Sequence, residues 1–168
     1  MAEEIINRVN QSGLTQIDLE DLRVPGDRVF IDIKEQLFQG IALREKDFRE
    51  FIASNDWSSY AGKHVALGCS EDAIIPTWAY MLVGVQLTPF AKTLVFGNLA
   101  DLEKTLFEQA LAKIKPEDFQ DAKIVIKGCS KESVPTEAYL KITQLLQPVA
   151  KSLFFGEPCS TVPLFKRK

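Results

Sequence analysis

The chain has 168 residues, of which 46% are hydrophobic and 26% are charged, with a formal net charge of −3 and a pI near 5.3. This composition is typical of a globular protein, and we expect residues 1–168 to form a single domain with a sizeable core. The weakly negative charge argues against a surface that binds nucleic acid or anionic membranes.

The sequence shows no signal for export or for membrane insertion. The first residues are acidic, and no apolar run is long enough for a signal peptide or a membrane helix. The chain holds three cysteines, and without an export signal reduced thiols are the default state. We therefore expect a cytoplasmic protein with neither a membrane nor a nucleic acid as its partner.

The first part of the chain predicts several short elements. Residues 1–13 predict a short helical arm, and residues 14–22 predict a half-exposed strand. The segment RVFIDI, residues 28–33, predicts a strand because it is rich in β-branched and aromatic residues. Residues 34–39 predict a single helical turn, with a strand end at Phe38 and Gly40 as the alternative. The apolar spacing of residues 44–55 predicts an amphipathic helix.

The rest of the chain contains an internal repeat. Lys63–Gly97 and Lys123–Gly156 share Gly-Cys-Ser, Pro-Thr-x-Ala-Tyr and Pro-x-Ala-Lys-x-Leu-x-Phe-Gly. If one residue is missing from the second loop, 16 of 35 aligned positions are identical, which indicates a duplication. Each copy predicts a strand, a helix and a second strand, and therefore a parallel βαβ unit with a right-handed crossover.

These elements define the fold class. Between the repeats, a helix capped by Asn98 or Asp101 is predicted to run to Ile114, and the tail, residues 157–168, predicts an extended segment. Strands that alternate with helices predict an α/β fold. We expect three α/β/α layers with a mainly parallel sheet of about five strands.

The helices of the two repeats differ in polarity. The first, Pro76–Leu87, is apolar nearly all round, whereas its copy is amphipathic. A helix that is hydrophobic on every side must be covered on every side. Either other elements of the chain cover Trp78, Met81, Leu82 and Val85, or a second copy of the protein does. We expect a homodimer through this helix.

The three cysteines, Cys69, Cys129 and Cys159, each precede a serine and follow a predicted strand. Sites in parallel sheets form at the carboxyl ends of strands, where helix N-termini favour thiolates. One hypothesis is that the thiols converge to bind zinc, iron or an iron–sulfur cluster, or to handle sulfur. The other is a non-catalytic dimeric scaffold or interaction protein whose cysteines are only small buried core residues, because their spacing matches no Cys-x-x-Cys pattern. A fourth metal ligand would be Asp72, Glu132 or Glu157.

No motif for a particular reaction is present. The only histidine, His64, lies at the start of a predicted strand, away from Cys69, and we expect it to be structural or on the surface. No glycine-rich phosphate loop is present, so nucleotide binding through such a loop is not expected. A thiol enzyme that uses Cys69 or Cys129 as its nucleophile is a further hypothesis, but we favour a role other than catalysis.

Three segments carry a family resemblance that covers essentially the whole chain: LFQGIALREKDFRE, CSEDAIIPTWAYML and FFGEPCSTVPLFKRK. The chain resembles an uncharacterised bacterial family from Bacteroidetes-type genomes, labelled as a domain of unknown function. Members of that family tend to be encoded beside the SUF-type iron–sulfur assembly system. The resemblance therefore implies an accessory role in cluster assembly or sulfur handling, with iron–sulfur assembly proteins as partners and Cys69, Cys129 and Cys159 as the site.

Overall fold

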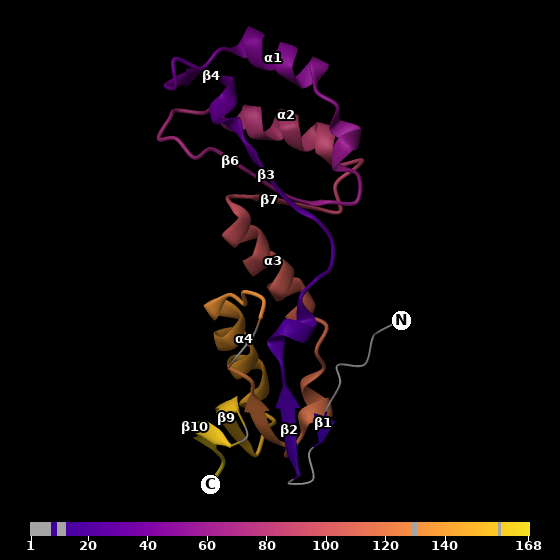
Figure 1. The fold of residues 1–168 in the computed structure, drawn as a ribbon, viewed down its shortest axis with the longest axis vertical. Coiled ribbons are helices and arrows are strands. Elements are labelled where there is room, and N and C mark those ends of the chain that lie inside the picture. Colours follow the sequence, from indigo (N-terminus) through magenta and orange to yellow (C-terminus); the bar gives the residue numbers. More distant parts are fainter. Residues whose placement is uncertain (1–7, 10–12, 129–130, 158) are drawn as a thin grey trace. The chain divides into compact units, whose positions relative to one another are not determined.

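The computed structural model describes residues 8–9, 13–128, 131–157 and 159–168 (Figure 1). The chain forms two compact units. Unit 1 comprises residues 1–24 and 106–168, and unit 2 comprises residues 25–105. No described helix is long and apolar enough to cross a membrane.

Unit 2 is built on a three-stranded parallel sheet in the order β3–β6–β7. A small antiparallel pair, β4 and β5, lies outside this sheet. The elements in chain order are β3 (Arg28–Asp32), the 3-10 helix η2 (Ile33–Gln36), β4 (Leu37–Phe38), β5 (Ala42–Leu43), α1 (Glu45–Ser54), η3 (Trp57–Tyr60), β6 (His64–Gly68), α2 (Thr77–Leu87) and β7 (Thr93–Phe96).

Helices cover both faces of the unit 2 sheet. Figure 1 shows α1 and α2 on one side of the strands and the start of α3 (Leu99–Leu111) on the other. On the first side, Ile31 of β3 shares a core with Phe48 of α1 and with α2. Because side chains alternate along a strand, Arg28 points to the opposite side, where it forms an ion pair with Glu103 of α3. Unit 2 therefore has three α/β/α layers.

Unit 1 contains a five-stranded sheet in the order β1–β2–β8–β9–β10. The three central strands are parallel, and the two edge strands are antiparallel to their neighbours. Its elements are β1 (Arg8–Val9), β2 (Leu14–Ile17), η1 (Leu19–Leu22), the second half of α3, η4 (Pro116–Phe119), β8 (Lys123–Ile126), α4 (Thr136–Leu146), β9 (Ser152–Glu157) and β10 (Ser160–Lys166).

Equivalent residues in the central strands of the two units differ by a constant number of positions, with no gap between the copies. His64 pairs with Thr93 in unit 2, and Lys123 pairs with Ser152 in unit 1, so both positions shift by 59 residues (123 − 64 and 152 − 93). Helices α2 and α4 begin 59 residues apart as well (136 − 77). The predicted gap in the second loop is therefore wrong. The shared Gly-Cys-Ser letters suggested it, whereas strand pairing and helix starts keep the two copies in register without it.

The duplication also extends beyond the repeat that is visible in the sequence. Asp18 directly follows β2 and Asp32 is the last residue of β3, and each caps a 3-10 helix through its carboxylate. Phe48 of α1 and Phe107 of α3 lie 59 positions apart (107 − 48), and each is fully buried in the core of its own unit. Each unit thus repeats a strand, a 3-10 helix, a helix and the βαβ segment.

Several predictions are confirmed. The α/β class holds, and both repeats form parallel βαβ units. Asn98 caps α3, because its side-chain oxygen accepts hydrogen bonds from the backbone N–H groups of Ala100 and Asp101. The strands lie in two main sheets and not in the one sheet that we expected, because β6 pairs with β3 while β8 pairs with β2. The tail is extended, as β10.

The amino-terminal predictions need correction. Arg8 and Val9 form strand β1 and are not helical, while residues 1–7 and 10–12 lie outside the described part. Only Leu14–Ile17 of the predicted strand over residues 14–22 is a strand, because Asp18 caps the 3-10 helix η1, which begins at Leu19. The helical turn predicted over residues 34–39 is η2, which ends at Gln36.

The apolar helix α2 is covered on some of its sides by its own chain. Trp78 and Leu82 pack against the unit 2 core, and the Trp78 ring contacts the Phe48 ring of α1 with centroids 6.1 Å apart. Met81 and Val85 are exposed. Of the two coverings that the sequence allows, neighbouring elements therefore explain Trp78 and Leu82 but not Met81 and Val85.

The paired core residues provide a test of the duplication. Phe48→Ala and Phe107→Ala should each lower the free energy of unfolding by about 3–5 kcal/mol, because each leaves a large cavity in one core. Leu140→Ala, at a side chain that is 61% exposed, should change it by less than about 0.5 kcal/mol. Urea denaturation followed by circular dichroism measures both effects. A small effect of either phenylalanine substitution would contradict the equivalence.

Candidate functional site

The carboxyl edge of the unit 2 sheet brings polar side chains together. Strand β3 ends at Asp32, which pairs with Gly68 at the end of β6. Cys69 and Ser70 follow directly, in the loop that leads to α2. Since both strands are parallel, their carboxyl ends lie at the same edge, where sites form in α/β sheets.

Asp32 holds this loop in place. Its Oδ1 accepts hydrogen bonds from the backbone N–H groups of Lys34 and Ser70, both at 3.1 Å. Its Oδ2 accepts a hydrogen bond from the Ser70 hydroxyl at 2.6 Å, and the Lys34 ammonium lies 3.8 Å away. Burial raises the pKa of Asp32, but the hydrogen bonds from Ser70 and Lys34 and the charge of Lys34 outweigh it, so the pKa is lowered. Asp32 is thus a fixed negative charge.

Tyr80 of α2 faces the same edge. Its ring packs edge-on against Phe96, with centroids 4.9 Å apart. Burial raises the pKa of Tyr80, and negative charge on Cys69 and Asp32 raises it further. The tyrosine therefore stays neutral as a hydroxyl donor. The half-buried Cys69 thiol lies in a neighbourhood with one fixed negative charge and one neutral hydroxyl.

The same edge of unit 1 follows this plan with different chemistry. Asp18, the counterpart of Asp32, accepts a hydrogen bond from the Lys127 ammonium at 3.1 Å. This hydrogen bond and the charge of Asp18 raise the pKa of Lys127. Tyr139 packs edge-on against Phe155 as Tyr80 does against Phe96, with centroids 5.7 Å apart. A lysine thus neutralises the aspartate in unit 1, whereas a serine hydroxyl binds it in unit 2.

The two predicted thiol ligands that the structure describes lie in different units. Cys69 lies in unit 2, whereas Cys159 is exposed in unit 1, in the turn between β9 and β10. Cys129 lies outside the described residues. Within the described ranges, no three His, Cys, Asp or Glu side chains are grouped closely enough to hold a metal. The convergence of Cys69, Cys129 and Cys159 stays a prediction.

The predicted fourth ligands are spread over both units. Asp72 is exposed in the Cys69 loop. Glu132 lies in the loop before α4, where its backbone N–H donates to the Glu20 carboxylate at 3.1 Å. Glu157 ends β9, and its charge adds to the raised pKa of Lys127. These positions do not indicate which of the three carboxylates would be the fourth metal ligand.

His64 is structural, as predicted. The side chain is buried, and its two ring nitrogens lie 2.9 Å from the Thr93 hydroxyl and 2.9 Å from the carbonyl oxygen of Pro25. Both ring nitrogens are thus occupied. His64 lies at the amino end of β6, opposite to Cys69, and cannot act on that thiol.

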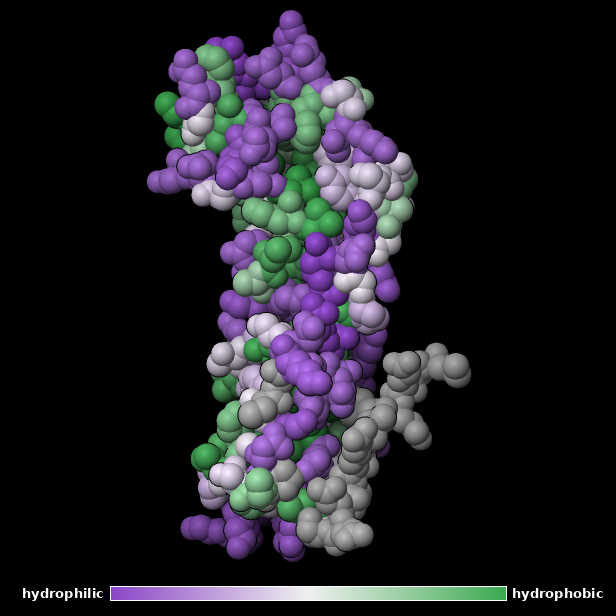
Figure 2. Space-filling view, viewed as in Figure 1, coloured by the Kyte–Doolittle hydropathy of each residue, from purple (hydrophilic) through white to green (hydrophobic). Residues whose placement is uncertain are grey.

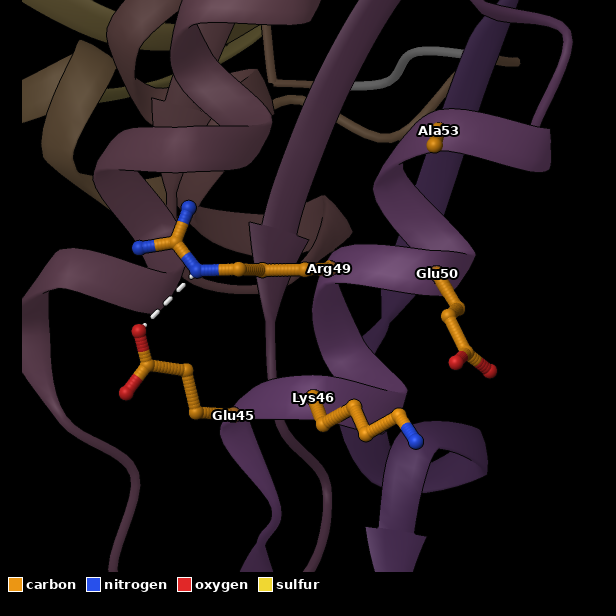
Figure 3. A pocket seen from close by; sticks show the side chains of 5 residues that line it. All are labelled: Glu45, Lys46, Arg49, Glu50 and Ala53. Carbon is orange, nitrogen blue, oxygen red and sulfur yellow. Dashed lines mark hydrogen bonds and ion pairs between the residues drawn. The ribbon is translucent and has the colours of Figure 1, made fainter.

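A shallow hollow on the surface of α1 is not a plausible site. Its lining consists of Glu45, Lys46, Arg49, Glu50 and Ala53, all from the same helix. Figure 3 shows that the Glu45 carboxylate bonds Arg49, while Lys46 and Glu50 extend away from that pair. These side chains do not converge on a common point, so we expect this face of α1 to be a solvated surface.

Asp32 was not singled out in the sequence. The signal that could have found it is the Ile-Asp pair, which occurs as Ile17-Asp18 and again as Ile31-Asp32. Two residues are too few to mark a repeat by themselves. The structure makes the pair informative, because both aspartates end equivalent strands and bind the loop after the neighbouring strand.

Comparison with known proteins gives one family match. A family model described as "Protein of unknown function (DUF2480)" matches residues 3–167. No curated protein and no solved structure matches the chain.

The hydrogen bonds to Asp32 predict a pH-dependent contribution to stability. Because its pKa is lowered by folding, this contribution is complete above the unfolded value of about 3.9 and is lost as the pH falls through the lower folded value. Asp32→Asn should cost about 1.5 kcal/mol at pH 7, and its difference from the wild type should shrink below about pH 4. Urea midpoints measured from pH 2.5 to 7 test this. Asp118→Asn, at an exposed position, is the control, and a pH-independent loss in Asp32→Asn would contradict the prediction.

Proposed function

Since the chain belongs to the DUF2480 family, we propose from its own residues that it is a thiol-dependent accessory protein. In this proposal Cys69, Cys129 and Cys159 bind zinc, iron or an iron–sulfur cluster, or carry sulfur, in the reducing cytoplasm. The family description assigns no activity, so the proposal depends on the accessibility and surroundings of the thiols.

The observation that carries the proposal is the exposure of the two described cysteines. Cys159 is exposed and Cys69 is half-buried. The competing hypothesis, in which the cysteines are only small buried core residues, does not fit these two. Accessible thiols at the ends of parallel strands can meet a ligand, whereas buried structural thiols are inert.

The charges around Cys69 favour a cation as the ligand. Asp32 is held ionised at the same edge of the sheet, and a second negative charge on the Cys69 thiolate would repel it. A bound soft or borderline metal ion relieves that repulsion, because thiolates are the preferred ligands of zinc and of iron–sulfur clusters. An anionic substrate would meet repulsion at this edge.

A hydrolytic or group-transfer role for Cys69 has less support. A nucleophilic cysteine requires a nearby base or positive charge that lowers its pKa. The only histidine is engaged at the other end of β6. We therefore favour metal or sulfur binding over catalysis, with Asp72, Glu132 or Glu157 as the additional ligand and iron–sulfur assembly proteins as partners.

The experiment is elemental analysis and visible spectroscopy on protein purified without oxygen. Each of Cys69→Ser, Cys129→Ser and Cys159→Ser should lower the metal content and the melting temperature together, because binding to the folded state stabilises it by mass action. The metal-free wild type should match the variants. Ser160→Ala, beside Cys159, is the control and should keep the metal. Full metal content in Cys159→Ser would exclude a three-thiol site.

A further inference from the structure

The outer edge of β7 is open, whereas the same edge in the other copy is covered. In unit 1, β10 pairs with the outer edge of β9 as an antiparallel strand, from Ser160 opposite Glu157 to Lys166 opposite Ser152. In unit 2, the equivalent strand β7 pairs with β6, and no described strand pairs with its other side. An open strand edge presents unpaired N–H and C=O groups that bind further strands readily.

The difference in exposure between equivalent side chains shows what the covering strand does. Leu153 of β9 is 0% exposed under β10, whereas its counterpart Leu94 of β7 is 36% exposed. Phe155 is 36% exposed, and its counterpart Phe96 is 70% exposed. Figure 2 shows hydrophobic surface gathered over β7 and the start of α3. Unit 2 thus carries the apolar side chains that an additional strand would cover, without that strand.

The side of α2 that lies beside β7 is also exposed. Thr77, Met81, Gly84 and Thr88 recur at intervals of four, three and four residues and form one stripe. Gly84 places this stripe next to β7, because a Cβ atom built there would lie 3.9 Å from Leu94. Met81 is 65% exposed.

Packing within the chain does not explain why a glycine stands at position 84, in the middle of α2. A glycine in the middle of a helix is destabilising relative to alanine, and such a residue normally permits the close approach of another backbone. The contact of 3.9 Å to Leu94 is ordinary, so an alanine would fit within this chain. The close approach of a second molecule would explain Gly84.

We propose that β7 pairs with β7 of a second copy, antiparallel and around a two-fold axis perpendicular to the sheet. The two three-stranded sheets then form one six-stranded sheet, and Leu94 lies beside the partner's Phe96. Both α2 helices lie on the same face. Given a strand spacing of about 4.8 Å, a helix over β6 and β7 comes within about 10 Å of its partner. Met81 and Gly84 of the two copies meet in that contact.

A second copy fits this surface better than an unrelated protein. The occupant must be an antiparallel strand with large apolar side chains on the helix side, as β10 is in unit 1, and β7 itself supplies Leu94 and Phe96. A two-fold contact uses the same patch on both molecules. A stable interface buries about 800 Å² per partner, more than one short strand offers, and the exposed stripe of α2 supplies additional apolar surface.

The test is light scattering and sedimentation of the full chain from about 1 to 100 µM, with a reductant present to prevent disulfides through the exposed Cys159. We expect a dimer whose dissociation constant rises at least about tenfold in Leu94→Lys and in Met81→Glu, since each places a charge in the interface. Leu140→Glu, at the position on α4 that matches Met81, is the control and should leave it unchanged. Circular dichroism checks that all variants are folded.

Two further variants test the geometry. Gly84→Ala should weaken the dimer and yet raise the melting temperature of the Met81→Glu monomer, because it crowds the interface but favours the helix. Val95→Cys, in a chain whose natural cysteines are replaced by serine, should form a disulfide between copies across the two-fold axis, and Phe154→Cys in unit 1 should not. A monomeric wild type at 100 µM, a dimer unaffected by Leu94→Lys and Met81→Glu, or a dimer not cross-linked by Val95→Cys would each overturn the proposal.

Discussion

The architecture depends on the parallel pairing of each βαβ repeat with one strand from upstream in the chain. A βαβ unit alone is a two-stranded sheet, too small to be stable by itself. Strand β6 therefore pairs with β3, and β8 pairs with β2. Because β2 and β3 lie next to each other in sequence but belong to different sheets, the chain completes unit 2 within residues 25–105 and then returns to unit 1. The boundary between the units falls inside α3, a continuous helix.

Several residues that are identical in the two copies serve the scaffold. Pro76 and Pro135 precede α2 and α4, where each directly precedes the first helical residue. Tyr80 and Tyr139 pack edge-on against Phe96 and Phe155. Such pairs have the same neighbours in each unit, and their repetition follows from packing. Their identity says little about function.

The sequence predicted the central part of each unit well, because the periodicity of strands and helices and the proline, glycine and asparagine caps are local signals. It did not reveal the upstream half of the duplication, since a buried strand such as β2 or β3 requires apolar residues without specifying which ones. The alignment gap arose because three identical letters, Gly-Cys-Ser, outweighed the strand register. Trp78 packs against α1, which is distant in sequence. The apolar pattern of α2 alone therefore could not predict that Trp78 is covered while Met81 is exposed.

The sequence predicted where the candidate site lies, but not all of the residues that form it. Strand ends next to helix starts pointed to the Cys69 loop, because that position follows from the βαβ order. Asp32 lies 38 residues before Ser70 in the sequence, and only the pairing of β3 with β6 brings its carboxylate to Ser70. An aspartate after a strand is common in turns, so its residue type alone carries no signal.

The positions where the copies differ therefore say most about function. Unit 1 neutralises its aspartate with Lys127 and covers its sheet edge with β10. In unit 2 the aspartate accepts hydrogen bonds from hydroxyl and amide groups, with the Lys34 ammonium 3.8 Å away, and a half-buried thiol lies at the same edge. Unit 2 also leaves β7 and the flank of α2 open. The open apolar edge would be a liability in a purely structural unit, because it invites aggregation. The two units can therefore have different roles on one scaffold. Unit 1 has the closed sheet edge and the aspartate that is paired with Lys127. Unit 2 presents the surfaces for which we propose a metal and a second copy as ligands.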